Sequence, residues 1–596
     1  MADPHNLAEI YSRQRNEAIE YLQSNYDASI LEVENPYLYP VTLQIKLIIE
    51  DQNINLLLSL PFNFPDSFPQ VKLDDQSFKK LYPLPHLNKY KTLCIYDEVV
   101  ATPNPDNPIG VLEASIEKSR EIILSGVLKH NVNDYTDEFE TYWAEDSVGS
   151  YLSIVQPSVT LKNVYLVPFK YQNWVEQGIF ADQKSEAIKW IQNLGGSFNE
   201  EEIVEVLYVP LKEPMQFPFP KYNINIFHLI KKNKSSNIND FFVYLSNSKR
   251  PSKVLFSVHA DEGYSWGVWE HIKPFKKIVS NYKGRKSTRT GIDGFRTNSQ
   301  HGWLELVKEF PKMEITKYSV QDVRATRLKS RGGDGKVNNI GLNVAIVGCG
   351  AVGSHIAQGL FDIGVQNLLL IDSDYLSFEN INRHLCGADQ VGQKKPVAVR
   401  DKLRRHYPTS QIHVSNDNIL SFLKRYPKAL NSYDVIIVAT GHTPTEIRLN
   451  ELQMNNLINK PILNVWVEPY LAGGHAVWNE PENKTALKML FNNGIYKYQI
   501  LKDGNLYSKK ELGCNTSYVP YGVLELKKFI IEVMMFIQQQ LNNEEKSSKL
   551  FTWLGNLTEQ KKNKRLLAPK WVGASDFSFR LNDIEINHES VDVNDL

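Results

Sequence analysis

A glycine-rich turn is the part of the chain best suited to binding a charged ligand. It contains Gly348, Gly350 and Gly353, follows the β-branched run 344–347 and precedes a helix-compatible segment. Glycine permits a tight turn and lets backbone amides approach a phosphate, and the positive end of the helix dipole lies at the same place. The turn therefore predicts the opening βα unit of a dinucleotide-type fold, which could serve NAD, FAD or ATP.

Charged and amide residues after the turn narrow the chemistry. They are Asp372, Asp374, Asn380, Arg383 and Lys395. A carboxylate about 20 residues past the glycines can hold a ribose hydroxyl of NAD or ATP. Attack of a carboxylate on the α-phosphate of ATP gathers negative charge, which Arg383 and Lys395 can offset. This spacing favours nucleotide adenylation over a plain dehydrogenase.

The same pattern resembles the adenylation domain of the ubiquitin-activating superfamily, which includes the bacterial ThiF and MoeB proteins. The resemblance implies that Arg383 also acts in catalysis and that ATP is bound by Gly348, Gly350, Gly353, Asp372, Asp374, Asn380, Arg383 and Lys395. The family has a T-D-N turn whose Asp helps to bind Mg²⁺, but this chain has Thr440-Gly441-His442. Either the triphosphate and carboxylates such as Asp372 and Asp374 hold Mg²⁺, or adenylation is impaired.

Four cysteines occur in the 596 residues: Cys94, Cys349, Cys386 and Cys514. With no C-x-x-C pair, neither a disulfide framework nor a resident four-cysteine metal site is supported. Cys349 and Cys386 are expected to be small buried residues. Relatives of the activating family hold a thioester-forming cysteine at about the place of Cys514. A thiol there could attack an acyl adenylate, because AMP is a good leaving group.

The N-terminal part carries a different pattern. Residues 6–24 predict an amphipathic helix, and two strands with alternating polarity follow it. A proline-aromatic corner at 60–71, then Pro85-His86-Leu87-Asn88 and Cys94, resembles a ubiquitin-conjugating domain. The resemblance implies that Cys94 accepts an acyl group and that Asn88 stabilises the oxyanion when a lysine amine attacks. Leu87 replaces the proline of the family motif, which leaves a degenerate fold with an inert Cys94 as an alternative.

These modules predict a multidomain α/β and α+β protein. We expect an N-terminal ubiquitin-conjugating-like α+β domain over 1–146, a linker α/β domain over 147–320, and a C-terminal Rossmann-like ThiF-type adenylation domain over 321–596. The last domain would include the crossover that carries Cys514. An R-x-x-R segment at Arg324 and Arg327 resembles one that reaches the partner subunit's nucleotide in relatives, so a homodimer is expected.

Composition excludes several classes of protein. The 67 basic and 68 acidic residues nearly cancel, so there is no electrostatic case for nonspecific binding of nucleic acid. No run of about 20 apolar residues occurs, and the N-terminus is too polar for a secretory signal. We therefore expect a cytoplasmic enzyme that does not enter a membrane.

The order of the modules resembles the activating/conjugating fusions of bacterial CBASS anti-phage operons. The resemblance implies that the C-terminal carboxylate of a cGAS-like nucleotidyltransferase is adenylated, passed to Cys514, moved to Cys94 and ligated to a lysine of a target protein. Three alternatives stay open. They are a nucleotide-binding scaffold without transfer chemistry, a sulfur-carrier adenylyltransferase, and an NAD-dependent oxidoreductase supported by the glycine turn alone.

Overall fold

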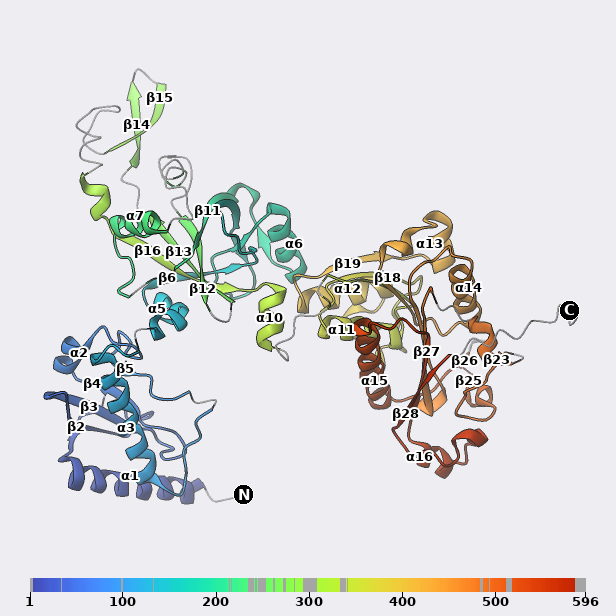
Figure 1. Ribbon diagram of the computed structural model, residues 1–596, viewed down its shortest axis with the longest axis horizontal. Helices are drawn as coiled ribbons and strands as arrows, with labels where there is room; N and C mark the ends of the chain where they lie inside the picture. Colours follow the sequence, from blue (N-terminus) through green and yellow to red (C-terminus); the bar gives the residue numbers. More distant parts are fainter. Residues whose placement is uncertain are drawn as a thin grey trace, which may run out of the picture. The chain divides into compact units, whose positions relative to one another are not determined.

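The computed structural model of the chain forms two compact units, residues 1–187 with 199–322 and residues 188–198 with 323–596 (Figure 1). The residues that the structure describes are 4–33, 35–97, 100–131, 133–213, 215, 217–233, 241, 244, 253–260, 263–271, 275–282, 285–292, 308–332, 339, 341–482, 486–492, 494–510 and 517–584. Among these residues, no helix combines the length and apolar character that crossing a membrane requires.

The first unit begins with an α+β domain in which two long helices pack against an antiparallel sheet. The helices are α1 (Pro4–Tyr26) and α3 (Pro108–Val127), and the short α2 (Asp75–Leu81) is capped by the Asp74 side chain. The sheet runs in the order β1 (Ser29–Leu31), β2 (Val41–Ile49), β3 (Gln52–Leu60), β4 (Gln70–Leu73) and β5 (Thr92–Leu93). Alternate residues of β2 and β3 are buried against the two helices, which is the physical reason for the alternating pattern in the sequence.

A closed barrel forms the central part of this unit. Its strands follow the order β11 (Val204–Leu211), β12 (Lys253–Ala260), β13 (Gly263–His271), β16 (Ile315–Asp322), β6 (Ser147–Ser153), β9 (Ile179–Ala181) and β7 (Lys162–Val167). Other elements here are α4 (Asp134–Asp137), α5 (Phe139–Glu145), α7 (Asn223–Lys232), β8 (Phe169–Lys170), β14 (Phe275–Tyr282) and β15 (Arg285–Ile292). Residues 188–198, which include most of α6 (Lys184–Leu194) and all of β10 (Ser197–Phe198), belong to the second unit. The sequence shows strand-like runs here but not the closure, because β16 pairs in parallel with the distant β6.

Helix α5 joins the conjugating-like part to the barrel through its side chains. Phe139 and Trp143 are buried in one core cluster with Phe256 and Trp269 of the barrel strands. The indole of Trp143 also donates a hydrogen bond of 3.0 Å to the carbonyl oxygen of Tyr318. Helix α5 therefore contributes to the barrel core.

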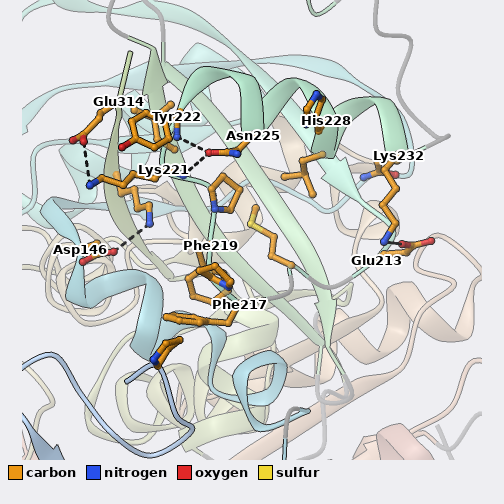
Figure 2. Close-up of a pocket in the computed structure, with 18 of the residues that line it drawn as sticks. Asp146, Glu213, Phe217, Phe219, Lys221, Tyr222, Asn225, His228, Lys232 and Glu314 are labelled. Atoms are coloured by element: carbon orange, nitrogen blue, oxygen red, sulfur yellow. Dashed lines mark hydrogen bonds and ion pairs between the residues drawn. The ribbon is translucent and has the colours of Figure 1, made fainter. Parts of the chain in front are cut away.

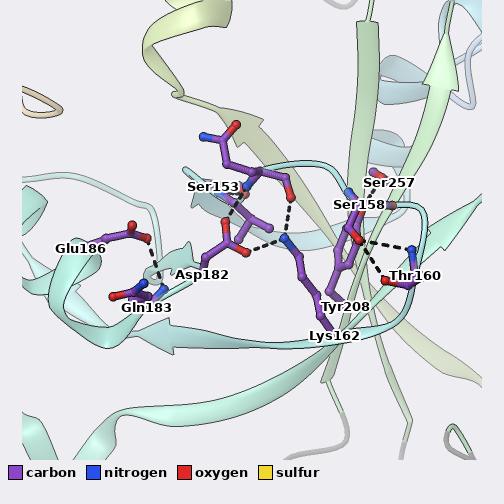
Figure 3. Close-up of polar contacts among 11 residues, drawn as sticks. Ser153, Ser158, Thr160, Lys162, Asp182, Gln183, Glu186, Tyr208 and Ser257 are labelled. Atoms are coloured by element: carbon purple, nitrogen blue, oxygen red, sulfur yellow. Dashed lines mark hydrogen bonds and ion pairs between the residues drawn. The ribbon is translucent and has the colours of Figure 1, made fainter. Parts of the chain in front are cut away.

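A polar network ties the loop after β6 to the barrel wall (Figure 3). Lys162 Nζ lies 2.5 Å from Asp182 Oδ1 and donates to the carbonyl of Gln156 at 2.6 Å. The Gln156 amide donates back to Asp182 Oδ2 at 2.7 Å, and the Tyr208 and Ser257 hydroxyls are 2.7 Å apart. Because its members bind one another, this network belongs to the framework of the barrel.

The second unit is a doubly wound sheet with antiparallel strands added at one edge. Its order is β19 (Gln411–Ser415), β18 (Asn367–Ile371), β17 (Asn343–Val347), β20 (Val435–Val438), β21 (Ile462–Val467), β22 (Gly473–Asn479), β27 (Lys549–Leu554) and β28 (Phe579–Asp583). The first five strands are parallel and the last three antiparallel. Short strands outside this sheet are β23 (Phe491–Asn492), β24 (Ile495–Tyr496), β25 (Lys509–Lys510) and β26 (Ser517–Tyr518).

Helices cover both faces of the parallel strands, so the strands are buried on both sides and read as continuous apolar runs. On one face lie α11 (Ala351–Asp362), α12 (Lys395–His406) and α15 (Val523–Asn542), and on the other α13 (Ile419–Arg425) and α14 (Thr443–Met454). The remaining helices are α10 (Ala325–Gly332) and α16 (Leu557–Lys562). The predicted Rossmann-like domain is confirmed.

Candidate active sites

The glycine turn lies between β17 and α11, at the carboxyl end of the parallel strands. Gly348 has a φ of 94°, which favours glycine. A Cβ at Gly348 would stand 2.5 Å from the carbonyl oxygen of Ala439, and one at Gly353 would stand 1.9 Å from that of Gly348. At Gly350, in contrast, a Cβ would meet no atom within 4 Å. The first and third glycines allow close backbone packing, and the second faces open space where a phosphate could approach.

The acidic residues after β18 join the turn to a lysine. Asp372 Oδ2 accepts the backbone N–H of Cys349 at 2.7 Å, and its Oδ1 accepts that of Asp374 at 2.8 Å. Lys395 Nζ lies 2.8 Å from Asp374 Oδ2. The Lys395 side chain is 13% exposed and the Asp374 side chain 64% exposed, so the carboxylate is the more accessible partner. A carboxylate has about four lone-pair sites, and Asp372 can thus still accept a ribose hydroxyl.

Two other predicted residues lie in the segment between β18 and α12. Asn380 Oδ1 accepts the backbone N–H and the hydroxyl of Ser377, both at 3.2 Å, so this side chain supports the local turn. Arg383 Nη1 donates to the carbonyl of Val519 at 3.1 Å, and its guanidinium lies 5.0 Å from the Tyr521 ring. Arg383 therefore contacts the segment that follows Cys514 in the sequence, whereas Lys395 contacts the acidic residues.

A buried carboxylate that the sequence interpretation missed supports the turn at Gly441. Glu446, in the first turn of α14, is 2% exposed and accepts the Thr440 hydroxyl at 2.9 Å. Burial raises its pKa to about 6, although the Thr440 hydroxyl and the amides of His442 and Gly441 oppose the shift. No motif in the sequence marks Glu446, because its role depends on burial against the turn that precedes its own helix.

The four cysteines differ in their surroundings. Cys349 and Cys386 are each 1% exposed, and burial raises the pKa of Cys386 to about 12. They are buried thiols, as expected. Cys514 lies outside the described residues, between β25 and β26, which pair with each other in antiparallel register.

Cys94 is exposed and lies beside a short antiparallel ladder. Its N–H donates to the carbonyl of His86 at 2.8 Å, and the N–H of Asn88 donates to that of Thr92 at 3.0 Å. Leu87 pairs with Leu93, so His86, Asn88 and Cys94 lie on the other face of this ladder. Asn88 Oδ1 accepts the backbone amides of Tyr90 and Thr92, which orients its NH₂ group.

Acidic residues surround His86 in the cavity of about 690 Å³ that also contains Cys94. His86 Nε2 lies 3.0 Å from Asp134 Oδ2, and its Nδ1 lies 3.3 Å from Glu138 Oε1. Glu138 and Asp134 raise the pKa of His86 against the effect of its burial, and His86 in turn lowers the pKa of Glu138. The Tyr142 hydroxyl lies 2.6 Å from the His86 backbone nitrogen. These contacts hold the loop that leads to Cys94.

We expect the stabilisation from His86 to depend on pH. It should be complete below histidine's ordinary pKa of 6.5 and lost as the pH rises through the raised pKa. Glu138 should keep its charge until the pH falls below its ordinary pKa of 4.5, because His86 lowers the pKa of this carboxyl. His86→Gln should therefore lower the thermal unfolding midpoint more at about pH 5.5 than at about pH 8.5. The exposed His259 provides a control, His259→Gln, and a pH-independent loss at His86 would contradict the prediction.

A larger cavity of about 980 Å³ lies between α7, β16 and the loop that contains Phe217 and Phe219 (Figure 2). Lys317 lines it, 3.3 Å from Asp146 and 4.9 Å from the Trp143 ring, and burial lowers the pKa of this lysine. The other ion pairs of the wall are Lys221–Glu314 and Lys232–Glu213, each at 3.1 Å. None of the predicted site residues that the structure describes lines this cavity.

Comparison with known proteins identifies both ends of the chain. Residues 326–493 match the model of the ThiF family, and residues 40–149 match that of prokaryotic E2 family B. The ATP-dependent ubiquitin transferase-like protein Cap2 of Enterobacter hormaechei is 30% identical over 167 residues, covering 26% of this chain and 26% of that protein. Cap2 of Vibrio cholerae is 25% identical over 234 residues, covering 36% of this chain and 37% of that protein.

Among solved structures, Escherichia coli MccB with succinimide has a TM-score of 0.29 and 16% identity, covering 41% of this chain and 64% of that chain. The match to each Cap2 protein spans well under half of that relative's length. The resemblance to activating and conjugating domains is confirmed by the two family matches. The chain therefore combines a region that matches prokaryotic E2 family B with a region that matches the ThiF family, and part of it is similar to Cap2.

Proposed function

We propose that this protein adenylates the C-terminal carboxylate of a protein with ATP and ligates the acyl group to a lysine amine through two cysteine thioesters. The observation that carries the proposal is the cluster in which Asp372 binds the glycine turn and Asp374 binds Lys395. This cluster offers amides, a cation and a carboxylate at one edge of the sheet, as adenylation requires. The same chain presents the exposed Cys94 on a conjugating-like domain.

In the first step, an oxygen of the substrate carboxylate attacks the α-phosphorus of ATP. A new P–O bond forms, the bond to the bridging oxygen breaks, and pyrophosphate leaves with the electron pair. Lys395 and Arg383 would offset the charge that gathers on the phosphates, and the amides near Gly350 would bind phosphate oxygens.

Mg²⁺ would be held by the phosphates and Asp374. Within the described ranges no group of three or more His, Cys, Asp or Glu side chains could hold a metal ion, so protein side chains alone do not form a metal site there. Mg²⁺ keeps several waters and commonly uses one or two carboxylates plus substrate phosphates, which the exposed Asp374 fits. Bound Mg²⁺ would neutralise charge on the triphosphate.

In the later steps, the Cys514 thiolate attacks the acyl carbon, a C–S bond forms, and AMP leaves as the C–O bond breaks. The thiol proton goes to solvent. The Cys94 thiolate then displaces Cys514 at the same carbon, and a lysine amine displaces Cys94 to form an amide. The NH₂ group of Asn88 would donate to the oxyanion in this last attack, and the amine proton goes to solvent.

We also propose the identity of the partners. The acyl donor would be a cGAS-like nucleotidyltransferase, and the acceptor a lysine of a target protein, in the cytoplasm of a bacterium. The likeness to Cap2 supports this assignment. We further propose a homodimer and the domain limits 1–146, 147–320 and 321–596.

A nucleotide-binding scaffold without transfer chemistry is the second candidate function. Gly441 favours it, because this residue has no oxygen-bearing side chain and the space beside it is open. A sulfur-carrier adenylyltransferase would also use the ThiF-type domain, but it would leave Cys94 without a role.

The test uses the purified full chain with a candidate donor protein. ATP–pyrophosphate exchange and an adduct sensitive to reducing agent are expected, and Cys514→Ala should keep the exchange and lose the adduct. Cys386→Ala, at a buried thiol, is the control and should retain both. ATP binding without exchange would favour the scaffold. ATP–pyrophosphate exchange with a sulfur-carrier protein and not with the nucleotidyltransferase would favour a sulfur-carrier adenylyltransferase.

A further inference from the structure

We infer that Glu468 is a positioning residue for the thioester step, because it anchors the chain at Ile500 and Leu501, directly before residues 502–519, which contain Cys514 and are called the Cys514 segment. The inference rests on the proposed function. Glu468 precedes the turn Pro469–Leu471, after β21, and is 8% exposed. None of the family motifs in the sequence includes it.

The Glu468 carboxylate binds two consecutive backbone amides. Its Oε1 accepts the N–H of Ile500 at 2.6 Å, and its Oε2 accepts the N–H of Leu501 at 2.8 Å. Hydrogen bonds to a charged acceptor are about twice as strong as neutral ones. Because the two bonds go to consecutive amides, they also fix the direction of the backbone there. The carboxylate therefore sets both the position and the orientation of the chain where it enters the Cys514 segment.

A buried histidine holds the carboxylate in place. His475 Nε2 lies 2.8 Å from Glu468 Oε1, and the His475 side chain is fully buried. Its ring centroid lies 5.5 Å from that of Trp466 and 4.8 Å from that of Tyr496, so the imidazole cannot turn freely. His475 Nδ1 has no hydrogen-bond partner among the described residues, which indicates that the N–H lies on Nε2 and donates to Glu468.

The exit of the Cys514 segment is held by the same turn. Tyr470 lies two residues after Glu468 in the sequence. Its N–H donates to the carbonyl of Pro520 at 2.5 Å. Tyr470 and Leu471 have φ values of 55° and 46°, a left-handed conformation that is costly for side chains of this size. Surrounding contacts must maintain this strain. One strained turn thus holds the entry of the segment through Glu468 and its exit through Tyr470.

Anchoring of this kind matters for the reaction because the thioester forms only when the Cys514 sulfur reaches the acyl carbon. The C–S bond forms as the C–O bond to AMP breaks, and a loosely held segment would present the thiol in fewer productive positions. Adenylation does not require the thiol, so loss of the Glu468 anchor should affect the second step and spare the first.

The experiment compares Glu468→Gln with Glu480→Gln in the full chain. Glu480 is a matched control, since it is 4% exposed, follows β22 and accepts the Trp478 indole N–H at 2.6 Å, and none of its side-chain hydrogen bonds goes to a described residue of the Cys514 segment. Glu468→Gln should slow single-turnover formation of the reducing-agent-sensitive adduct at least about 10-fold, while the exchange rate and its KM for ATP stay within about twofold. Glu480→Gln should leave both unchanged.

The other possible results distinguish a positioning role of Glu468 from a general structural role. Equal loss of exchange and adduct in Glu468→Gln would overturn the positioning role in favour of a general structural one, and an unchanged adduct rate would also overturn it. If this variant does not fold, Glu468→Asp keeps the charge but shortens its reach, and it should show the same selective loss. Exchange without any adduct in the unmodified protein would contradict the proposed function itself, whereas adduct formation insensitive to Glu468 would contradict this inference alone.

Discussion

Replacement of Cys94 by alanine is expected to abolish ligation to lysine while the acyl group accumulates on Cys514. The exposed Cys94 is the second acceptor in the proposed relay, and without it the conjugating-like domain has no thiol to receive the acyl group from Cys514. We expect the ligation rate to fall by at least about 10³-fold, with ATP–pyrophosphate exchange unchanged. Intact-protein mass spectrometry before and after reduction would measure the trapped adduct.

Cys349→Ala is an unsuitable control because Cys349 lies in the glycine turn, so the buried Cys386→Ala is the better one. It should ligate at the rate of the unmodified protein. Persistent ligation in Cys94→Ala would mean that the amine attacks the Cys514 thioester directly. The conjugating-like domain would then act only in binding.

Replacement of Lys395 by alanine should reduce ATP–pyrophosphate exchange by about 10²- to 10³-fold, the loss typical of a removed donor to developing negative charge. The Lys395 ammonium is mostly buried and held 2.8 Å from Asp374, so its position does not need to be established during the reaction. Alanine would remove this cation and leave Asp374 unpaired near the phosphates.

The neighbouring lysine provides the control for this experiment. Lys394 Nζ donates to the carbonyl of Ser373 at 2.5 Å and lies 3.8 Å from the Tyr375 ring, so it has a comparable charge and a different set of partners. Lys394→Ala should change the exchange rate by less than about fivefold. An equal loss in both variants would indicate that net charge, and not the placed Lys395, supports adenylation.

Features encoded within a few residues could be predicted from the sequence. The glycine turn is one example, because a φ of 94° at Gly348 and the close approach of Gly353 to its carbonyl exclude other residues whatever the rest of the chain does. The parallel strands are another, since burial on both faces requires unbroken apolar runs. The alternating strands and amphipathic helix of the N-terminal domain follow from one-sided burial in the same way.

Partners far apart in the sequence were decided only by the tertiary structure. His86 meets Asp134 and Glu138, and Glu468 meets Ile500, because packed helices and strands bring these groups together. Closure of the barrel through β6 and β16 has the same origin. Backbone sterics and periodic burial restrict the residue types at neighbouring positions, so they can be recognised in the sequence. A hydrogen bond across the fold requires only one suitable group at each end, and many residues could supply that group. The sequence by itself therefore determined the two modules and their candidate chemistry, and the tertiary structure decided which side chains hold those candidates in place.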